Sequence, residues 1–249
     1  MRIFLVSGIV AGLGAGFLLG LMQVGFITPI IVEAEVYENQ IPATHEERSA
    51  NNHDPRHHLT EKGGIRRSLF TILGASLLGS AIGIVAAVLM GVIAAQNLKI
   101  SLRQGLLLGL AGYLAFNIIP GLGVAPAPPG VQGAPFDARQ SWWLISSMMA
   151  VAGFITWAVA PHIFVDHFNV RLRYAKIFSI IMALSFIATP FIIGAPVVEL
   201  NFSSEALRQI NSQFLIVTFV VNAVFWMILG SLLSLTTAYI GRRHPGGVS

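Results

Sequence analysis

Hydrophobic residues along the chain gather into six long runs that are separated by polar segments. The runs occupy residues 3–32, 69–95, 102–119, 142–163, 177–193 and 214–240. A helix needs about 20 apolar residues to cross the hydrocarbon core of a bilayer, and each run is near or above that length. The pattern predicts an all-α, polytopic integral membrane helix bundle, a single membrane domain over residues 1–249. We expect about six transmembrane helices, within a range of five to seven.

The composition agrees with this class and excludes others. Hydrophobic residues make up 55% of the chain and charged residues only 10%, against about 25% charged residues in a soluble domain. A soluble enzyme, a nucleic-acid-binding domain and a disordered chain are therefore excluded, and the lipid bilayer is the expected environment. The isoelectric point is near 9.9, but the basic residues are scattered at the edges of the apolar runs. The chain has no cysteine, so it has no thiolate metal site.

Basic residues near the ends of the runs predict the orientation. The first run is about twice as long as the apolar part of a secretory signal, so we expect it to be retained as a span. Positive residues are denser in the segments that are cytoplasmic if the N-terminus is cytoplasmic, and such residues favour the cytoplasmic side in short loops. Both termini are thus expected in the cytoplasm. The acidic loop over residues 33–67 and a Pro/Gly-rich loop over residues 120–141 are then extracytoplasmic.

Small residues recur at helical spacing inside the runs. The first run has a glycine at every fourth position, and the second and third runs have pairs with the same spacing. These glycines are Gly8, Gly12, Gly16, Gly20, Gly79, Gly83, Gly105 and Gly109. Such spacing lets two helix backbones approach closely. The glycines indicate either ordinary tight packing or the sliding surface of a transporter.

Three amides lie within the apolar runs, at Gln23, Asn117 and Asn222. An unpaired amide in hydrocarbon costs a few kcal/mol, so each either lines a polar transport pathway or bonds to a neighbouring helix. No Asp, Glu, Lys, Arg or His lies near the middle of any run. Ion chemistry is therefore expected either at the outer edge of the membrane or not in this chain.

The first loop concentrates side chains that bind metal ions. Between positions 33 and 61 it holds seven of the 11 acids and four of the seven histidines. Imidazole and carboxylate together suit divalent cobalt, nickel or zinc. The candidate metal ligands are Glu33, Glu35, Glu38, His45, His53, His57 and His58. The alternative is a solvated loop without a metal.

Two other segments carry candidate chemistry. His162, Asp166 and His167 form a smaller group, which is a metal release site, a pair that supports metal ligands, or an interfacial cap. The prolines of the second loop favour a stiff extended path. Trp142 and Trp143 follow it, where interfacial aromatic residues anchor a span.

Taken in order, several short motifs resemble the CbtA family of predicted cobalt transporter subunits. The motifs are PIIVEAEVYE (29–38), GLAGY (109–113), PGLGVAPAPPG (120–130), ARQSWW (138–143), GAP (194–196) and NAVFW (222–226). Together they cover nearly the whole chain. The sequence departs from the family at Ala127, where the proline loop commonly has a glutamate. The family is usually described with five spans, one fewer than the apolar runs predict.

The resemblance implies a non-enzymatic membrane subunit for cobalt uptake in support of cobalamin synthesis, in the bacterial cytoplasmic membrane. It also implies a small, one-span, His-bearing CbtB-like partner subunit. The transported Co(II), or Ni(II) or Zn(II), is cargo, and no permanently bound cofactor is expected. Two alternatives stay open: an auxiliary scaffold that transports nothing itself, and a membrane enzyme that uses Asp54, His57 and His58 on a lipid-linked substrate.

Overall fold

The computed structural model describes residues 2–38, 64–95, 101–131, 133–196, 200, 202 and 204–243. Every regular element within these ranges is helical, and six helical stretches are long and apolar enough to cross a membrane. This confirms the expected all-α membrane fold with six spans, one more than the resemblance implies. The chain is therefore a multi-pass membrane protein.

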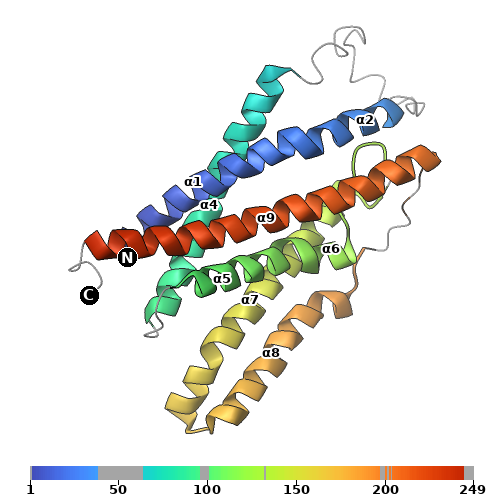
Figure 1. Cartoon of the computed structure of the whole chain (residues 1–249). Coiled ribbons are helices and arrows are strands. Elements are labelled where there is room, and N and C mark those ends of the chain that lie inside the picture. The colour runs from blue at the N-terminus through green and yellow to red at the C-terminus, as the bar shows by residue number, and fades with distance from the viewer. Residues whose placement is uncertain are drawn as a thin grey trace. The chain divides into compact units, whose positions relative to one another are not determined.

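Two of the six spans contain a π-helical segment between two α-helical parts, and the other four are uninterrupted α-helices (Figure 1). In chain order the elements are α1 (Arg2–Met22), η1 (Gln23–Ile27), α2 (Thr28–Glu38), α4 (Ile65–Ala95), α5 (Leu102–Tyr113), η3 (Leu114–Ile118), α6 (Ile119–Gly123), α7 (Phe136–Phe168), α8 (Leu172–Ile193) and α9 (Glu205–Arg243).

Several helices extend beyond the apolar runs that predicted them. α2 continues to Glu38, so Glu33, Glu35 and Glu38 lie on a helix and not in the loop to which the sequence assigned them. The cause is packing, because Ala34 is buried against Leu207 and Ile210 of α9. Hydropathy marks only the part of a helix that lies in hydrocarbon, whereas backbone hydrogen bonding continues wherever a neighbouring helix supports it.

The chain divides into two compact units. Unit 1 comprises Met1–Leu110, Ala127–Val131 and Asn201–Ser249, and unit 2 comprises Ala111–Pro126 and Gln132–Leu200. Unit 1 thus holds the first two spans, the start of α5 and all of α9. Unit 2 holds the remainder of the third span together with α7 and α8.

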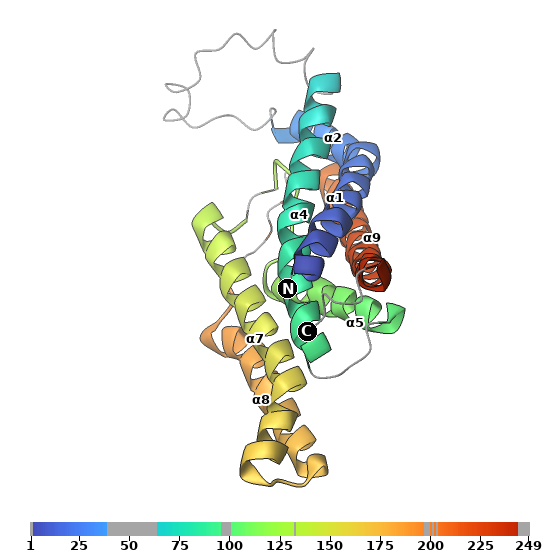
Figure 2. The same cartoon turned by 90° about the vertical axis from the view of Figure 1, so that its left-hand side faces the viewer.

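In unit 1, α1 and α4 lie side by side (Figure 2), and their glycine faces pack directly against each other. A Cβ atom added at Gly8 would lie 2.5 Å from the carbonyl oxygen of Gly83, and one added at Gly20 would lie 2.6 Å from Ile72 Cα. α1 therefore has room only for glycine at these positions, and α4 has room only for glycine at Gly79 and Gly83. Because the hydrophobic effect is weak between helices in lipid, such close van der Waals packing must hold the pair together.

α9 forms the second long contact of unit 1. It runs antiparallel to α1 and α2, and a Cβ at Gly14 would touch Leu232 Cδ1 at 3.4 Å. Another face of α9 packs on the start of α5, where Gly105 contacts Gly230 and Gly109 contacts Trp226. The N-terminus and the C-terminal end of α9 lie at the same end of this unit (Figure 1).

In unit 2, α7 and α8 form an antiparallel pair. Small buried residues line their contact, and Ala183 lies opposite Gly153. A second contact joins Ala150 of α7 to Ala115 and Ile119 of the third span. α8 ends at Ile193, where Gly194 adopts a φ of 109°, a backbone conformation that favours glycine.

The two interrupted spans share one local design. In each, a five-residue π segment is followed by one residue and then by a proline, Pro29 after η1 and Pro120 after η3. A proline within a helix lacks an N–H donor and collides with the carbonyl four residues earlier. The wider π turn makes room for the ring. Pro120 therefore lies inside helix α6, although the sequence predicted an extended path from that residue onward.

Candidate functional site

The end of α2 presents the carboxylates that the sequence assigned to metal capture. Glu33 is exposed, while the side chain of Glu35 is only 19% exposed. Arg67 in the first turn of α4 donates a hydrogen bond from Nη2 to Glu35 Oε1 at 3.3 Å. Glu35 is thus partly shielded from solvent and already beside a cation, in a place that water can still reach.

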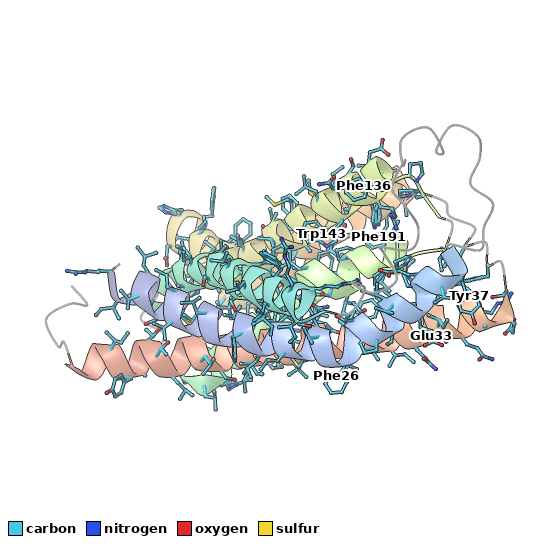
Figure 3. The ribbon with its side chains drawn as sticks, turned by 90° about the horizontal axis from the view of Figure 1, so that it is seen from above. Phe26, Glu33, Tyr37, Phe136, Trp143 and Phe191 are labelled. Atoms are coloured by element: carbon cyan, nitrogen blue, oxygen red, sulfur yellow. The ribbon has the colours of Figure 1, made fainter. Side chains whose placement is uncertain are left out.

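Apolar packing holds this carboxylate end of α2 in position. Ala34 is buried against Leu207 and Ile210 of α9, and Tyr37 packs at the edge of the same cluster. Val131 of the Pro/Gly-rich loop also packs there, so this loop covers one side of the cluster. Figure 3 shows Glu33 and Tyr37 at the end of α2, beside the start of α9.

The remaining predicted metal ligands are not tested by the structure. His45, His53, His57 and His58 lie outside the described residues, and the side chain of Glu38 does too. Among the described residues, no group of three or more His, Asp or Glu side chains could hold a metal ion. His162, Asp166 and His167 are all exposed at the end of α7 and do not form such a group.

The three predicted pathway amides occupy different surroundings. Gln23 begins η1 and Asn117 lies within η3. π segments occur often at functional sites. Asn222 lies on α9, and its Nδ2 donates to the carbonyl oxygen of Thr218 at 2.8 Å. The structure therefore places Gln23 and Asn222 in unit 1 and Asn117 in unit 2.

Two polar residues of α9 were missed by the sequence analysis. Asn211 is 6% exposed and its Oδ1 is buried without a hydrogen-bond partner among the described residues. Thr218 Oγ1 is buried in the same way. Their spacing from Asn222, 11 and four residues, was a signal that they share a helix face. Arg67 was missed as the partner of Glu35, because residues 32 positions apart give no local signal.

The tryptophans beside the Pro/Gly-rich loop do more than lie at an interface. Trp142 is buried, and its Nε1 donates to the carbonyl oxygen of Pro120 at 2.8 Å. Trp143 Nε1 donates to the carbonyl oxygen of Phe116 at 3.0 Å. Pro120 has no N–H group that could donate to the carbonyl oxygen of Phe116. The indole of Trp143 donates to this carbonyl oxygen instead. Both residues therefore stabilise the third span.

Comparison with known proteins places these features in a wider context. A family model described as a probable cobalt transporter subunit (CbtA) matches residues 1–238, nearly the whole chain. No curated protein and no solved structure matched it. The matched range includes the α2 carboxylates, the Pro/Gly-rich loop and nearly all of α9.

Proposed function

Because the chain belongs to the CbtA family of probable cobalt transporter subunits, we propose that it is the membrane subunit of a cobalt uptake system that supports cobalamin synthesis. The observation that carries this proposal is the family match over residues 1–238, which includes the first five spans and nearly all of α9. The six apolar helices supply the membrane passage that such a subunit needs.

The capture site lies at the end of α2 and in the segment that follows it. Glu33, Glu35 and Glu38 gather the ion together with the loop histidines His45, His53, His57 and His58. Carboxylate and imidazole suit divalent cobalt, and nickel or zinc would bind similarly. The position of Glu35 supports this role, because its carboxylate is partly shielded from solvent at the end of α2. A divalent ion displaces Arg67 from this carboxylate when it binds.

The ion then crosses between helices that carry neutral ligands. Gln23 and Asn222 of unit 1, and Asn117 of unit 2, are the amides that offer oxygen atoms to the ion. Neutral ligands bind a divalent ion weakly enough to release it, which passage requires. The sequence contains no P-loop motif for ATP binding, so the driving force comes from a partner or from a gradient. A one-span, His-bearing CbtB-like subunit is the proposed partner.

The proposed uptake direction requires the metal-capture site at the end of α2 to lie outside the cytoplasmic membrane. With both termini in the cytoplasm, the end of α2 faces the outside, where the metal is collected. The basic residues support this direction, since the short loops on the proposed outer side carry fewer of them.

Uptake of radioactive cobalt by cells that express the complete system tests the proposal. We expect Glu35→Gln and His57→Ala each to weaken uptake at low cobalt concentration by about tenfold, since losing one metal ligand costs roughly 1.5 kcal/mol. The maximal rate should change less, because a high cobalt concentration compensates for weaker capture.

Glu205→Gln is the matched control. Glu205 is an exposed acid at the start of α9, paired with Arg208 at 3.7 Å, at the end of unit 1 where α2 also ends. This variant should take up cobalt like the wild type. Unchanged uptake in both Glu35→Gln and His57→Ala would remove the α2 end from the mechanism. Purified protein that carries no cobalt into liposomes, alone or with its partner, would support the scaffold alternative.

A further inference from the structure

Three polar residues of α9 share one side of this helix. Asn211, Thr218 and Asn222 are spaced by seven and four residues, which places them within a sector of about 40° on a helix with 3.6 residues per turn. The neighbouring sector holds Leu207, Ile210 and Leu232, which contact α1 and α2. This row of three residues, Asn211, Thr218 and Asn222, therefore lies beside the surface that α9 presents to the first span.

Two side-chain oxygen atoms of these residues make no hydrogen bond within the part of the chain that the structure describes. Asn211 Oδ1 and Thr218 Oγ1 are buried without a partner among the described residues, and Asn211 is 6% exposed. Threonine in a helix commonly donates to the carbonyl four residues earlier, as Thr236 and Thr237 of α9 do. Buried polar groups without partners are costly in a membrane. Such atoms point to a ligand.

The antiparallel packing fixes which residue of the first span lies opposite each residue of the row. Gly14 lies level with Leu232, and Ala34 lies level with Leu207 and Ile210. Between these two contacts, the regular rise of both helices places Asn222 level with Gln23 and Thr218 level with η1. Asn211 comes about one helical turn inside Glu35. Figure 1 shows α9 alongside the continuous α1–η1–α2 helix.

We propose that the metal ion, after capture at Glu35, passes through unit 1 along the oxygen atoms of Asn211, Thr218 and Asn222, between α9 and the first span. This inference rests on the proposed function and extends it to Asn211 and Thr218. Amide and hydroxyl oxygen atoms replace part of the hydration shell of the ion without a fixed charge. A series of weak sites of this kind permits both entry and release. The Nδ2 bond of Asn222 to Thr218 orients that amide and leaves Oδ1 for the ion.

The natural absence of cysteine permits a direct accessibility test. Single cysteines at Asn211, Thr218 and Asn222 are treated, in the full-length protein in membranes, with a small water-soluble thiosulfonate reagent. We expect all three to react, and cobalt chloride to slow the reaction. Val220→Cys is the control, because Val220 is an apolar side chain that is 55% exposed on α9, and it should not react. Absence of reaction at all three positions, or reaction that cobalt does not slow, overturns the proposal.

Uptake kinetics then separate the row from the capture site. Thr218→Val keeps the side-chain shape and removes the hydroxyl group. It should lower the maximal rate of cobalt uptake by about tenfold, the effect of losing one polar contact, and leave the affinity of the purified protein for cobalt unchanged. Thr236→Val, whose hydroxyl bonds to Leu232 at 2.7 Å, should keep the wild-type rate.

The outcomes distinguish the two proposals. A wild-type rate in both Thr218→Val and Asn211→Leu, in a system that takes up cobalt, refutes the row and leaves the proposed function intact. A wild-type system that takes up no cobalt refutes both. Variants that fail to fold are recognised by loss of cobalt binding at the capture site, and the cysteine reactions of the remaining positions then decide.

Discussion

At the scale of single residues, two indoles on α7 donate hydrogen bonds that stabilise the third span. Pro120 removes one backbone donor from the third span, and Trp143 donates to the carbonyl of Phe116 where that donor is missing. Trp142 donates to Pro120 itself and packs edge-on against Phe191, with ring centroids 5.3 Å apart. The bond of Trp142 is buried, so water does not replace it. The same reasoning explains why the unpartnered oxygen atoms of α9 are informative.

Trp142→Phe should test this stabilisation. Phenylalanine keeps an aromatic ring but cannot donate to Pro120, so we expect a loss of about 1 kcal/mol in the free energy of unfolding. Thermal unfolding of the purified protein in detergent measures it. Trp157→Phe is the control on the same helix, because Trp157 is 54% exposed. Equal stability of the two variants would show that the indole bond is unimportant.

At the scale of helices, glycine spacing decides which surfaces meet. The glycines of α1 lie on one side of the helix and contact Gly79, Gly83 and Ala75 of α4. Phe26 lies on another side of the first span and is 62% exposed, and Figure 3 shows it pointing outward from the ribbon. The sequence predicted this close packing correctly. Whether these surfaces also slide during transport stays a prediction.

Gly12→Val should separate α1 from α4. A side chain at this position meets Ser80 Cα, which a Cβ would approach to 2.7 Å. Overpacking of this kind costs about 1–3 kcal/mol, so we expect poorer yield and a lower unfolding temperature. Gly74→Val is the matched control on α4, because a Cβ at Gly74 meets nothing within 4 Å. Similar behaviour of the two variants would mean that the glycine contact is not needed.

At the scale of the whole molecule, six spans require both termini to lie on the same side of the membrane. The structure agrees within unit 1, where the N-terminus and the end of α9 lie at the same end. Five spans, as the family is usually described, would place the termini on opposite sides. The distribution of basic residues adds the direction and favours the cytoplasm for both.

Reporter fusions test this topology in living cells. Green fluorescent protein fused after residue 249 should fluoresce, because it folds in the cytoplasm, and alkaline phosphatase inserted after residue 50 should be active outside. Alkaline phosphatase fused to the C-terminus serves as the control and should be inactive. An active phosphatase at the C-terminus would contradict the six-span arrangement with cytoplasmic ends.

Sequence alone determined the class of the protein, the number of spans and the glycine surfaces. The reason is that hydrocarbon thickness sets the length of each apolar run, and the lack of water forces the backbone into helices. It also indicated Gln23, Asn117 and Asn222, because amides are conspicuous in apolar runs. It did not indicate that α2 continues through its carboxylates.

Only the tertiary structure decided which groups meet. The ion pair of Glu35 with Arg67 and the indole bonds to the third span join residues that are distant in sequence. The burial of Asn211 depends on the register between helices. In spans that are apolar on every side, hydrophobic periodicity does not reveal which side faces a neighbour. Packing of one helix on another supplies that choice, and with it the candidate path for the ion.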